Sequence, residues 1–305
     1  MVSMFDTRNA VWEGLGKDVN GAVTIDDVMR IADLDWNVVQ KPIYTDNRLI
    51  KGYRANVRED NNNVLGIVTN RYSVVQNRDG FAFTEELLGN GFSYETAGCI
   101  NGGKKIWLLA KLDGCQLAGE DYDPYLVFFN THDGSGSIRV AITPIRVVCQ
   151  NMINLALRRS SRSWSCVHKG DIRSKLEEAR YTLSHTKEYL ESLNEELGNL
   201  KLQKLDDAKV KEYVETLLPL KENEPSQVRR RNIESMRKDL LYRYFFAPDL
   251  VDVEKSAYRF INAVSDFATH TSEHKETKHY QENLFDKSAN GNPLIDKAYA
   301  LVKAA

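Results

Sequence analysis

The chain has 305 residues, of which 42% are hydrophobic and 28% are charged, and its formal net charge is -2. This composition excludes collagen-like, low-complexity and wholly disordered proteins, and the near-neutral charge argues against a uniformly basic nucleic-acid binder. No apolar run reaches the roughly 20 residues that span a bilayer, and the four cysteines show no CxxC spacing. We therefore expect a cytoplasmic protein that binds no membrane and has no disulfide framework.

Residues 1–172 predict a sheet domain with few helices. Thr24 is placed to cap a short helix that ends near Asp33, and a second helix is expected to begin at Asn77. Alternating apolar residues predict strands over 36–43 (broken at Pro42), 52–57, 65–75, 92–99, 105–112, 125–131 and 138–148. A third helix is expected over 151–157. This order favours an α+β fold with an antiparallel, hairpin-rich sheet over an alternating, doubly wound one.

Residues 173–270 predict a helical region that opens with a four-heptad helix. The heptad positions are Leu176, Leu183, Leu190 and Leu197, with Ala179, Thr186, Leu193 and Leu200. The pattern fits a seam between chains or a hairpin within one chain, and both alternatives stay open. Further helices are expected over 207–218, 226–246 and 256–270. Residues 271–305 are expected to be a polar, partly mobile C-terminal segment.

The near-neutral total conceals a basic segment. Residues 1–136 carry 13 basic and 19 acidic side chains, whereas residues 137–175 carry 8 basic and 1 acidic. Arginines beside an aromatic ring are typical of a nucleic-acid groove. The expected nucleic-acid-binding residues are Arg139, Arg146, Arg158, Arg159, Arg162, Trp164, Lys169 and Arg173. A second basic face is expected at Arg229, Arg230, Arg237 and Lys238. The alternative is that these cations pair with acidic neighbours or cover a solvated surface.

Motifs for catalysis or metal binding are weak. The segment GCINGGKK (98–105) nearly matches a phosphate-binding loop, but Lys105 replaces the Ser or Thr and a strand pattern follows, so we interpret it as a hairpin turn. His132 and Asp133 could form a catalytic pair, although Asp-Gly turn chemistry explains them better. Four residues, Cys149, Cys166, His132 and His168, lack close metal-ligand spacing. We expect no catalytic residues, no metal and no cofactor.

Several ordered motifs carry a resemblance. They are WEGLG (12–16), LDWNV (34–38), LGIVTNRYSVVQN (65–77), YETAGCINGGKKIWLLAKL (94–112), THDGSGS (131–137), PIRVVCQN (144–151) and AYRFINAVSDF (257–267). The chain resembles the phage/plasmid-like family whose shared region is a domain of unknown function (number 932), which implies a mobile genetic element. Near the end, Lys297 lies in a segment that resembles a diverged form of that family's Gly-rich, Lys-containing close.

In outline only, the chain is also similar to phage single-strand annealing proteins such as Redβ and Erf, which hold single-stranded DNA in a basic groove of a ring or filament. The resulting hypothesis is a phage-derived, homo-oligomeric protein that binds single-stranded nucleic acid and acts in recombination. One alternative is a protein-interaction or counter-defence module that binds a host protein. Another is an enzyme that processes nucleic acid or nucleotides, with His132 and Asp133 as its first candidates.

Overall fold

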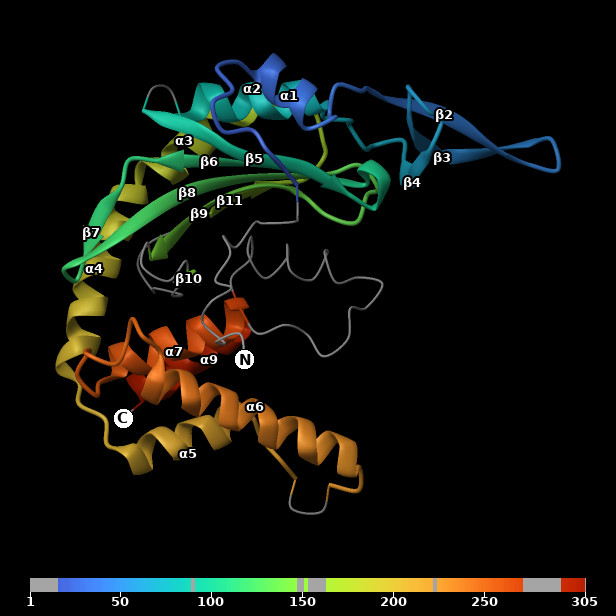
Figure 1. The fold of residues 1–305 in the computed structure, drawn as a ribbon. Coiled ribbons are helices and arrows are strands. Elements are labelled where there is room, and N and C mark those ends of the chain that lie inside the picture. The colour runs from blue at the N-terminus through green and yellow to red at the C-terminus, as the bar shows by residue number, and fades with distance from the viewer. Residues whose placement is uncertain are drawn as a thin grey trace.

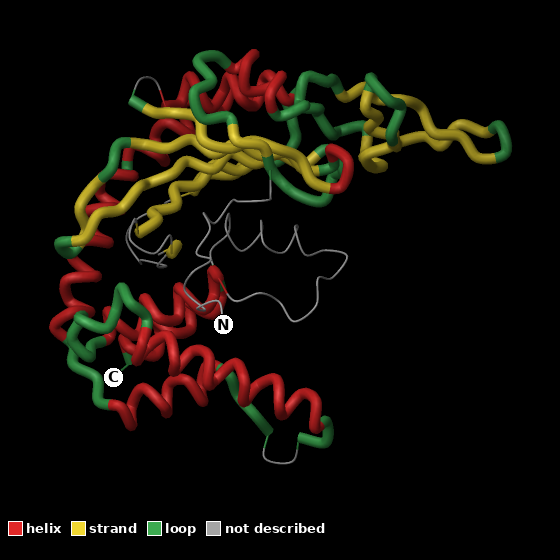
Figure 2. The backbone as a smooth tube through the Cα atoms, in the orientation of Figure 1, coloured by secondary structure: helices red, strands yellow, loops and turns green. Residues whose placement is uncertain are grey.

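The computed structural model describes residues 16–88, 91–146, 151–152, 163–221, 224–270 and 292–304. It confirms the α+β class, because antiparallel sheets precede a region of helices (Figure 1). Some helices cover the large sheet, and the others form a separate group that follows the strands along the chain (Figure 2). None of the helices within these ranges is long and apolar enough to cross a membrane.

Within these ranges, the larger sheet has eight antiparallel strands. Its main order is β1-β5-β6-β8-β9-β10, while β7 pairs with β8 and β11 pairs with β9. The strands are β1 (Lys17–Asp18), β5 (Phe92–Ile100), β6 (Lys105–Leu112), β7 (Cys115–Leu117), β8 (Glu120–Thr131), β9 (Ile138–Arg146), β10 (Asn151–Met152) and β11 (Ser163–Cys166). Residues 101–103 form the short turn η1 between β5 and β6, which confirms the expected hairpin. The helix expected from Asn151 is wrong at its start, since residues 151–152 pair with β9 as a strand; residues 153–157 lie outside the described residues.

Helices α1 (Ile25–Ile31) and α2 (Asn77–Leu88) cover one face of this sheet (Figure 1). The Thr24 hydroxyl accepts a hydrogen bond from the backbone amide of Asp27 at 3.2 Å, so the expected N-cap of α1 is confirmed. Phe81 of α2 packs edge-on against Phe128 of β8 with ring centroids 6.0 Å apart. Burial of these rings fixes the helix layer on the sheet.

A second sheet consists of β2 (Val38–Thr45), β3 (Arg48–Arg58) and β4 (Val64–Thr69), in that order. Pro42 lies within β2 and does not end it, because β2 is an edge strand whose outer amide needs no partner. β4 pairs with β3 only from Tyr53 to Val57, so the other end of the β2–β3 hairpin projects as a two-stranded ribbon (Figures 1 and 2). We call residues 41–54 the finger.

From Thr186 onward the helical region packs around α7 (Ala257–His270), whose residues from Ala257 to Phe267 are all buried, whereas Ile172 and Ala179 are buried in the core of the large sheet. The elements are η2 (Ile172–Lys175), α3 (Leu176–Ser184), α4 (Thr186–Leu202), α5 (Asp207–Leu217), α6 (Gln227–Phe246), α7 (Ala257–His270) and α9 (Pro293–Lys303). The expected four-heptad helix is not continuous, because His185 divides it into α3 and α4. Leu193, Leu197 and Leu200 are buried in the core of their own chain.

The sheet and the helices meet at β7 and β8. The backbone amide of Ala118 donates to Asn194 Oδ1 at 2.7 Å, and Lys201 Nζ donates to the Ala118 carbonyl at 2.6 Å. Leu117 and Tyr122 are buried in the same apolar core as α4 and α7. The two parts of the chain therefore share one packed interface.

Candidate nucleic-acid interface

The tip of the finger is a tight two-residue turn. Thr45 pairs with Arg48, and the intervening Asp46 and Asn47 have φ values of 46° and 61°. Both residues therefore adopt the left-handed conformation of a type I′ turn, which Asp and Asn tolerate better than most residues. This turn matches the twist of the two strands, whose register shifts once within the finger, between Pro42 and Tyr44.

The finger has no core behind it. Each residue from 41 to 54 is exposed except Ile43, which is half-buried. Tyr44 is 61% exposed and Tyr53 is 50% exposed, and Leu49 and Ile50 are exposed as well. A two-stranded hairpin is only marginally stable in water by itself, and grouped exposed apolar side chains mark interaction surfaces. The finger therefore has the properties of a binding element.

The finger is also strongly basic. It carries Lys41, Arg48, Lys51 and Arg54 against one acid, Asp46. Lys41 Nζ donates to Asn62 Oδ1 at 2.8 Å. The side chains of Arg48, Lys51 and Arg54 have no hydrogen-bond or ion-pair partner within the part of the chain that the structure describes. Unpaired cations beside exposed tyrosines are the combination that phosphates and bases recognise.

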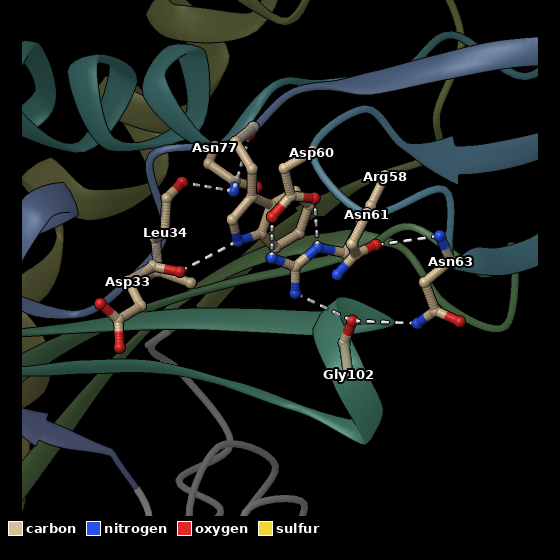
Figure 3. Close-up of polar contacts among 9 residues, drawn as sticks. Asp33, Leu34, Arg58, Asp60, Asn61, Asn63, Asn77 and Gly102 are labelled. Atoms are coloured by element: carbon tan, nitrogen blue, oxygen red, sulfur yellow. Dashed lines mark hydrogen bonds and ion pairs between the residues drawn. The ribbon is translucent and has the colours of Figure 1, made fainter.

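Arg58 anchors β3 at the base of the finger (Figure 3). Its guanidinium lies over the Trp36 ring at 4.3 Å from the centroid and donates to the Asp60 carboxylate at 2.6 and 3.0 Å. A third hydrogen bond reaches the Gly102 carbonyl in η1 at 3.2 Å. These hydrogen bonds from Arg58 lower the pKa of Asp60. Because its charge is neutralised here, Arg58 positions the finger and is not counted among the free cations.

A buried polar cluster fixes the other side of the base. Asn56 Nδ2 donates to the His132 carbonyl at 2.7 Å, and His132 Nε2 lies 2.9 Å from Asn77 Oδ1. His132 is fully buried, and its ring packs edge-on against Trp36 with centroids 5.5 Å apart. Burial lowers the pKa of His132 to about 3. The His132 carbonyl thus ties the loop after β8 to β3 of the second sheet, and its neutral ring ties the same loop to α2.

This geometry does not favour a catalytic pair of His132 and Asp133. His132 has no exposed surface through which a substrate could reach its ring. Asp133 Oδ1 accepts a hydrogen bond from the Ser135 backbone amide at 2.8 Å, as the turn interpretation predicted. Within the described ranges, no three His, Cys, Asp or Glu side chains lie close enough to hold a metal ion.

The basic segment 137–175 does not form one exposed groove among the described residues. The role expected for Trp164 is wrong, because its ring is only 4% exposed and stacks on Phe83 at 5.5 Å, inside the core between sheet and α2. Lys169 is exposed, and Arg173 lies 3.6 Å from Asp79. Arg139 is half-buried in β9, and Arg146 ends that strand. Three of the expected residues, Arg158, Arg159 and Arg162, lie outside the described residues.

The second basic face is also partly structural. Arg237 Nε donates to the Leu218 carbonyl at 2.9 Å and so caps the C-terminal end of α5, which corrects its assignment to a free surface. Arg229 Nε lies 3.4 Å from Glu224 Oε2, and Arg230 is half-buried. Lys238 is exposed.

Sequence reasoning missed the finger. The charge count over residues 1–136 combined its cations with acidic neighbours, and the total of that region is negative. The signal was nevertheless present in KPIYTDNRLIKGYR (41–54), which places four cations and two tyrosines around an Asp-Asn turn. A shorter charge window would have found it.

Comparison with protein-family models matched residues 64–289 to a domain of unknown function, DUF932. Comparisons with curated proteins and with solved structures found no match. The matched region begins at β4 and continues past α7, so the finger lies on the N-terminal side of it.

Proposed function

This chain belongs to the DUF932 family, and we propose that it binds single-stranded nucleic acid through the finger, residues 41–54. The observation that supports the proposal best is the exposed two-stranded ribbon with three unpaired cations and two tyrosines. Two-stranded ribbons are an established means of contacting nucleic acid, since their width fits a groove or follows a strand. No metal or nucleotide is needed for this activity.

Each group on the finger has a separate task in the proposal. Arg48, Lys51 and Arg54 neutralise phosphates and release counterions, which provides affinity that does not depend on sequence. Tyr44 and Tyr53 stack on bases. A duplex keeps the faces of its bases stacked inside, so exposed tyrosines favour an unpaired strand. We place this binding in strand annealing by an oligomer of phage origin, where strands must be held with their pairing edges accessible.

The test is a salt titration of binding to a labelled single-stranded oligonucleotide, followed by fluorescence anisotropy. We expect the triple variant Arg48→Ala, Lys51→Ala, Arg54→Ala to bind more weakly, and the slope of log affinity against log salt to fall by about 2. The control changes Lys187, Lys204 and Lys211, which are exposed on the helical region, to Ala. It removes the same charge and should leave the slope unchanged.

Two results would contradict this function. One is a wild-type protein without affinity for single strands at low salt. The other is an equal loss of affinity in the finger variant and its control, which would show that affinity depends on the net charge of the protein and not on the finger. A duplex of the same sequence forms the second arm, and tighter binding to the duplex would exclude the preference for single strands.

One observation favours binding to a host protein instead. β2 is an edge strand, and beyond β4 both strands of the finger leave backbone groups without a neighbouring strand. Such an edge can accept a strand from a partner protein. Capture of a host protein by wild-type chain but not by a finger variant, without any affinity for DNA, would establish this alternative.

A further inference from the structure

A pocket of about 210 Å³ lies at one end of the large sheet, on the loop between β8 and β9. The pairing of Lys105 with Thr131, and of Phe129 with Arg139, places all four residues on one face at the ends of β6, β8 and β9. Ser135, Gly136 and Ser137 of the connecting loop complete the wall. The pocket is therefore formed by three strand ends and a Ser/Gly loop.

Two cations line this small volume. Lys105 is only 8% exposed, and Arg139 is half-buried. Among the described residues, the guanidinium of Arg139 has no ion-pair or hydrogen-bond partner. Charges that are partly removed from water interact more strongly with an anion than exposed charges do. The lining thus favours an anion that can accept hydrogen bonds from a guanidinium and from the hydroxyls of Ser135 and Ser137.

The loop is held in shape by its own hydrogen bonds. Thr131 Oγ1 donates to the Gly136 carbonyl at 3.1 Å, and the Ser135 amide donates to Asp133 Oδ1 at 2.8 Å. Asp133, the acid of this loop, is thereby engaged with the backbone. A Cβ atom at Gly136 would lie 3.0 Å from the Thr131 methyl group, so glycine lets the loop approach the strand closely. The hydroxyl groups are presented on a preformed turn.

The pocket is adjacent to the sheet that carries the finger. The ideal Cβ position of Gly66 in β4 lies 2.5 Å from the Asp133 carbonyl oxygen, so the loop packs directly on β4. Asn56 of β3 reaches the same loop through the His132 carbonyl. The loop that forms the pocket therefore contacts both β4 and the base of β3, the strand that continues into the finger.

We propose that this pocket binds a phosphomonoester, and that the phosphate is the terminal phosphate of the single strand bound by the finger. The guanidinium of Arg139, together with the hydroxyls of Ser135 and Ser137, offers the donors that the oxygens of a phosphomonoester accept from. The volume is below the roughly 300–1,000 Å³ of pockets that enclose whole drug-sized ligands, so a phosphate group fits while the nucleoside stays outside. The claim that this phosphate belongs to a nucleic-acid strand rests on the proposed function, whereas the binding of phosphate itself does not.

The experiment has two arms. In the first, isothermal titration calorimetry measures binding of inorganic phosphate to the full chain. In the second, fluorescence anisotropy compares one oligonucleotide with a 5′-phosphate, a 3′-phosphate or free hydroxyl ends. Arg139→Gln removes the charge and keeps hydrogen-bonding capacity, and Ser137→Ala removes one hydroxyl. The matched control is Arg30→Gln on α1, whose side chain is exposed and pairs with Asp27. Circular dichroism establishes that each variant is folded.

We expect one end-phosphorylated oligonucleotide to bind at least about tenfold more tightly than the free-hydroxyl form, the value of one charge-assisted contact. Arg139→Gln should abolish that preference and Ser137→Ala should reduce it, while Arg30→Gln keeps it. If inorganic phosphate binds but no end-phosphorylated oligonucleotide is preferred, the bound phosphate is not that of a strand end. Absence of phosphate binding to the folded wild type overturns the pocket itself.

The two proposals fail separately. If strand affinity depends on Arg48, Lys51 and Arg54 but not on the terminal phosphate, the pocket assignment is wrong and the finger stands. If phosphate binds in an Arg139-dependent manner while single strands do not bind at all, the finger assignment is wrong and the pocket stands.

Discussion

Two buried histidines connect the chemistry of single residues to the stability of the fold. His132 contacts Asn77 and Trp36, and His168 stacks on Tyr72 with ring centroids 4.4 Å apart. Burial lowers the pKa of His132 to about 3 and that of His168 to about 4. Both rings are therefore neutral in the folded protein near neutral pH, and charging either one is unfavourable in place.

The sign of the pH dependence follows from these pKa values. An unfolded histidine titrates near 6.5, so between about pH 6.5 and 4 the unfolded chain binds more protons than the folded chain. The free energy of unfolding should be constant above pH 6.5 and fall below it, by up to about 1.4 kcal/mol per pH unit for each histidine. Urea unfolding at pH 7.5, 6.0 and 5.0 measures this change.

His168→Phe is the matched variant for this prediction, because it keeps a ring against Tyr72 and removes the titration. Its stability should fall less steeply with acid than that of the wild type. Identical pH dependence of the two proteins would show that other groups control acid unfolding.

At the scale of elements, the contact between β4 and the β8–β9 loop depends on one glycine. A Cβ at Gly66 would lie 2.5 Å from the Asp133 carbonyl oxygen and 2.6 Å from its Cα, and a backbone cannot yield as a side chain can. We expect Gly66→Ala to lower the free energy of unfolding by more than about 1 kcal/mol. Denaturant titration measures the loss.

Gly198 provides the control within the same chain. It lies inside α4, and its Cβ would meet nothing within 4 Å. Gly198→Ala should stabilise the protein by about 0.5–1 kcal/mol, since alanine is the better helix former. Equal effects of the two substitutions would show that the β4 contact is looser than its geometry indicates.

The finger should be removable without loss of the fold. Replacing residues 43–53 by Asn-Gly would join Pro42 and Arg54, which are paired neighbours, through a tight turn. Because the removed side chains are exposed or half-buried, the thermal midpoint should change little while affinity for single strands is lost. A large fall in the midpoint would mean that the finger stabilises the domain.

Most elements could be predicted from the sequence, and the failures have physical causes. The capping residue Thr24 and the apolar segments that form β5, β6 and β9 are local signals, and the structure contains each of them. The stacking of Trp164 on Phe83 is a contact between distant segments, which local charge and aromatic content do not encode. Exposure of the finger is likewise a tertiary property, because its sequence would also fit a strand that other elements cover.

At the scale of the whole molecule, the heptad pattern of residues 176–200 also shows that a local sequence signal does not determine which surfaces come into contact. Its spacing is the same for a seam within a chain and a seam between chains, and tertiary packing decides between them. Leu193, Leu197 and Leu200 are buried against the chain's own helices, so these positions serve the monomer's core. An oligomer would have to use other surfaces.

Leu197→Ala tests this arrangement. The side chain is fully buried, so its truncation should cost about 2–5 kcal/mol of unfolding free energy. Because the contact lies within one chain, the loss should be the same at low and high protein concentration. A loss that grows on dilution would instead indicate an interface between chains.

The exposed finger also has an evolutionary consequence. Substitutions in a segment that buries almost nothing cost little folding energy, so selection can act on its side chains almost solely through what they contact. The Asp46-Asn47 turn and the contacts of Arg58 hold the ribbon in place, while substitutions of Tyr44, Leu49 and Ile50 cost little folding energy. Binding preference can therefore diverge quickly on a scaffold that changes slowly.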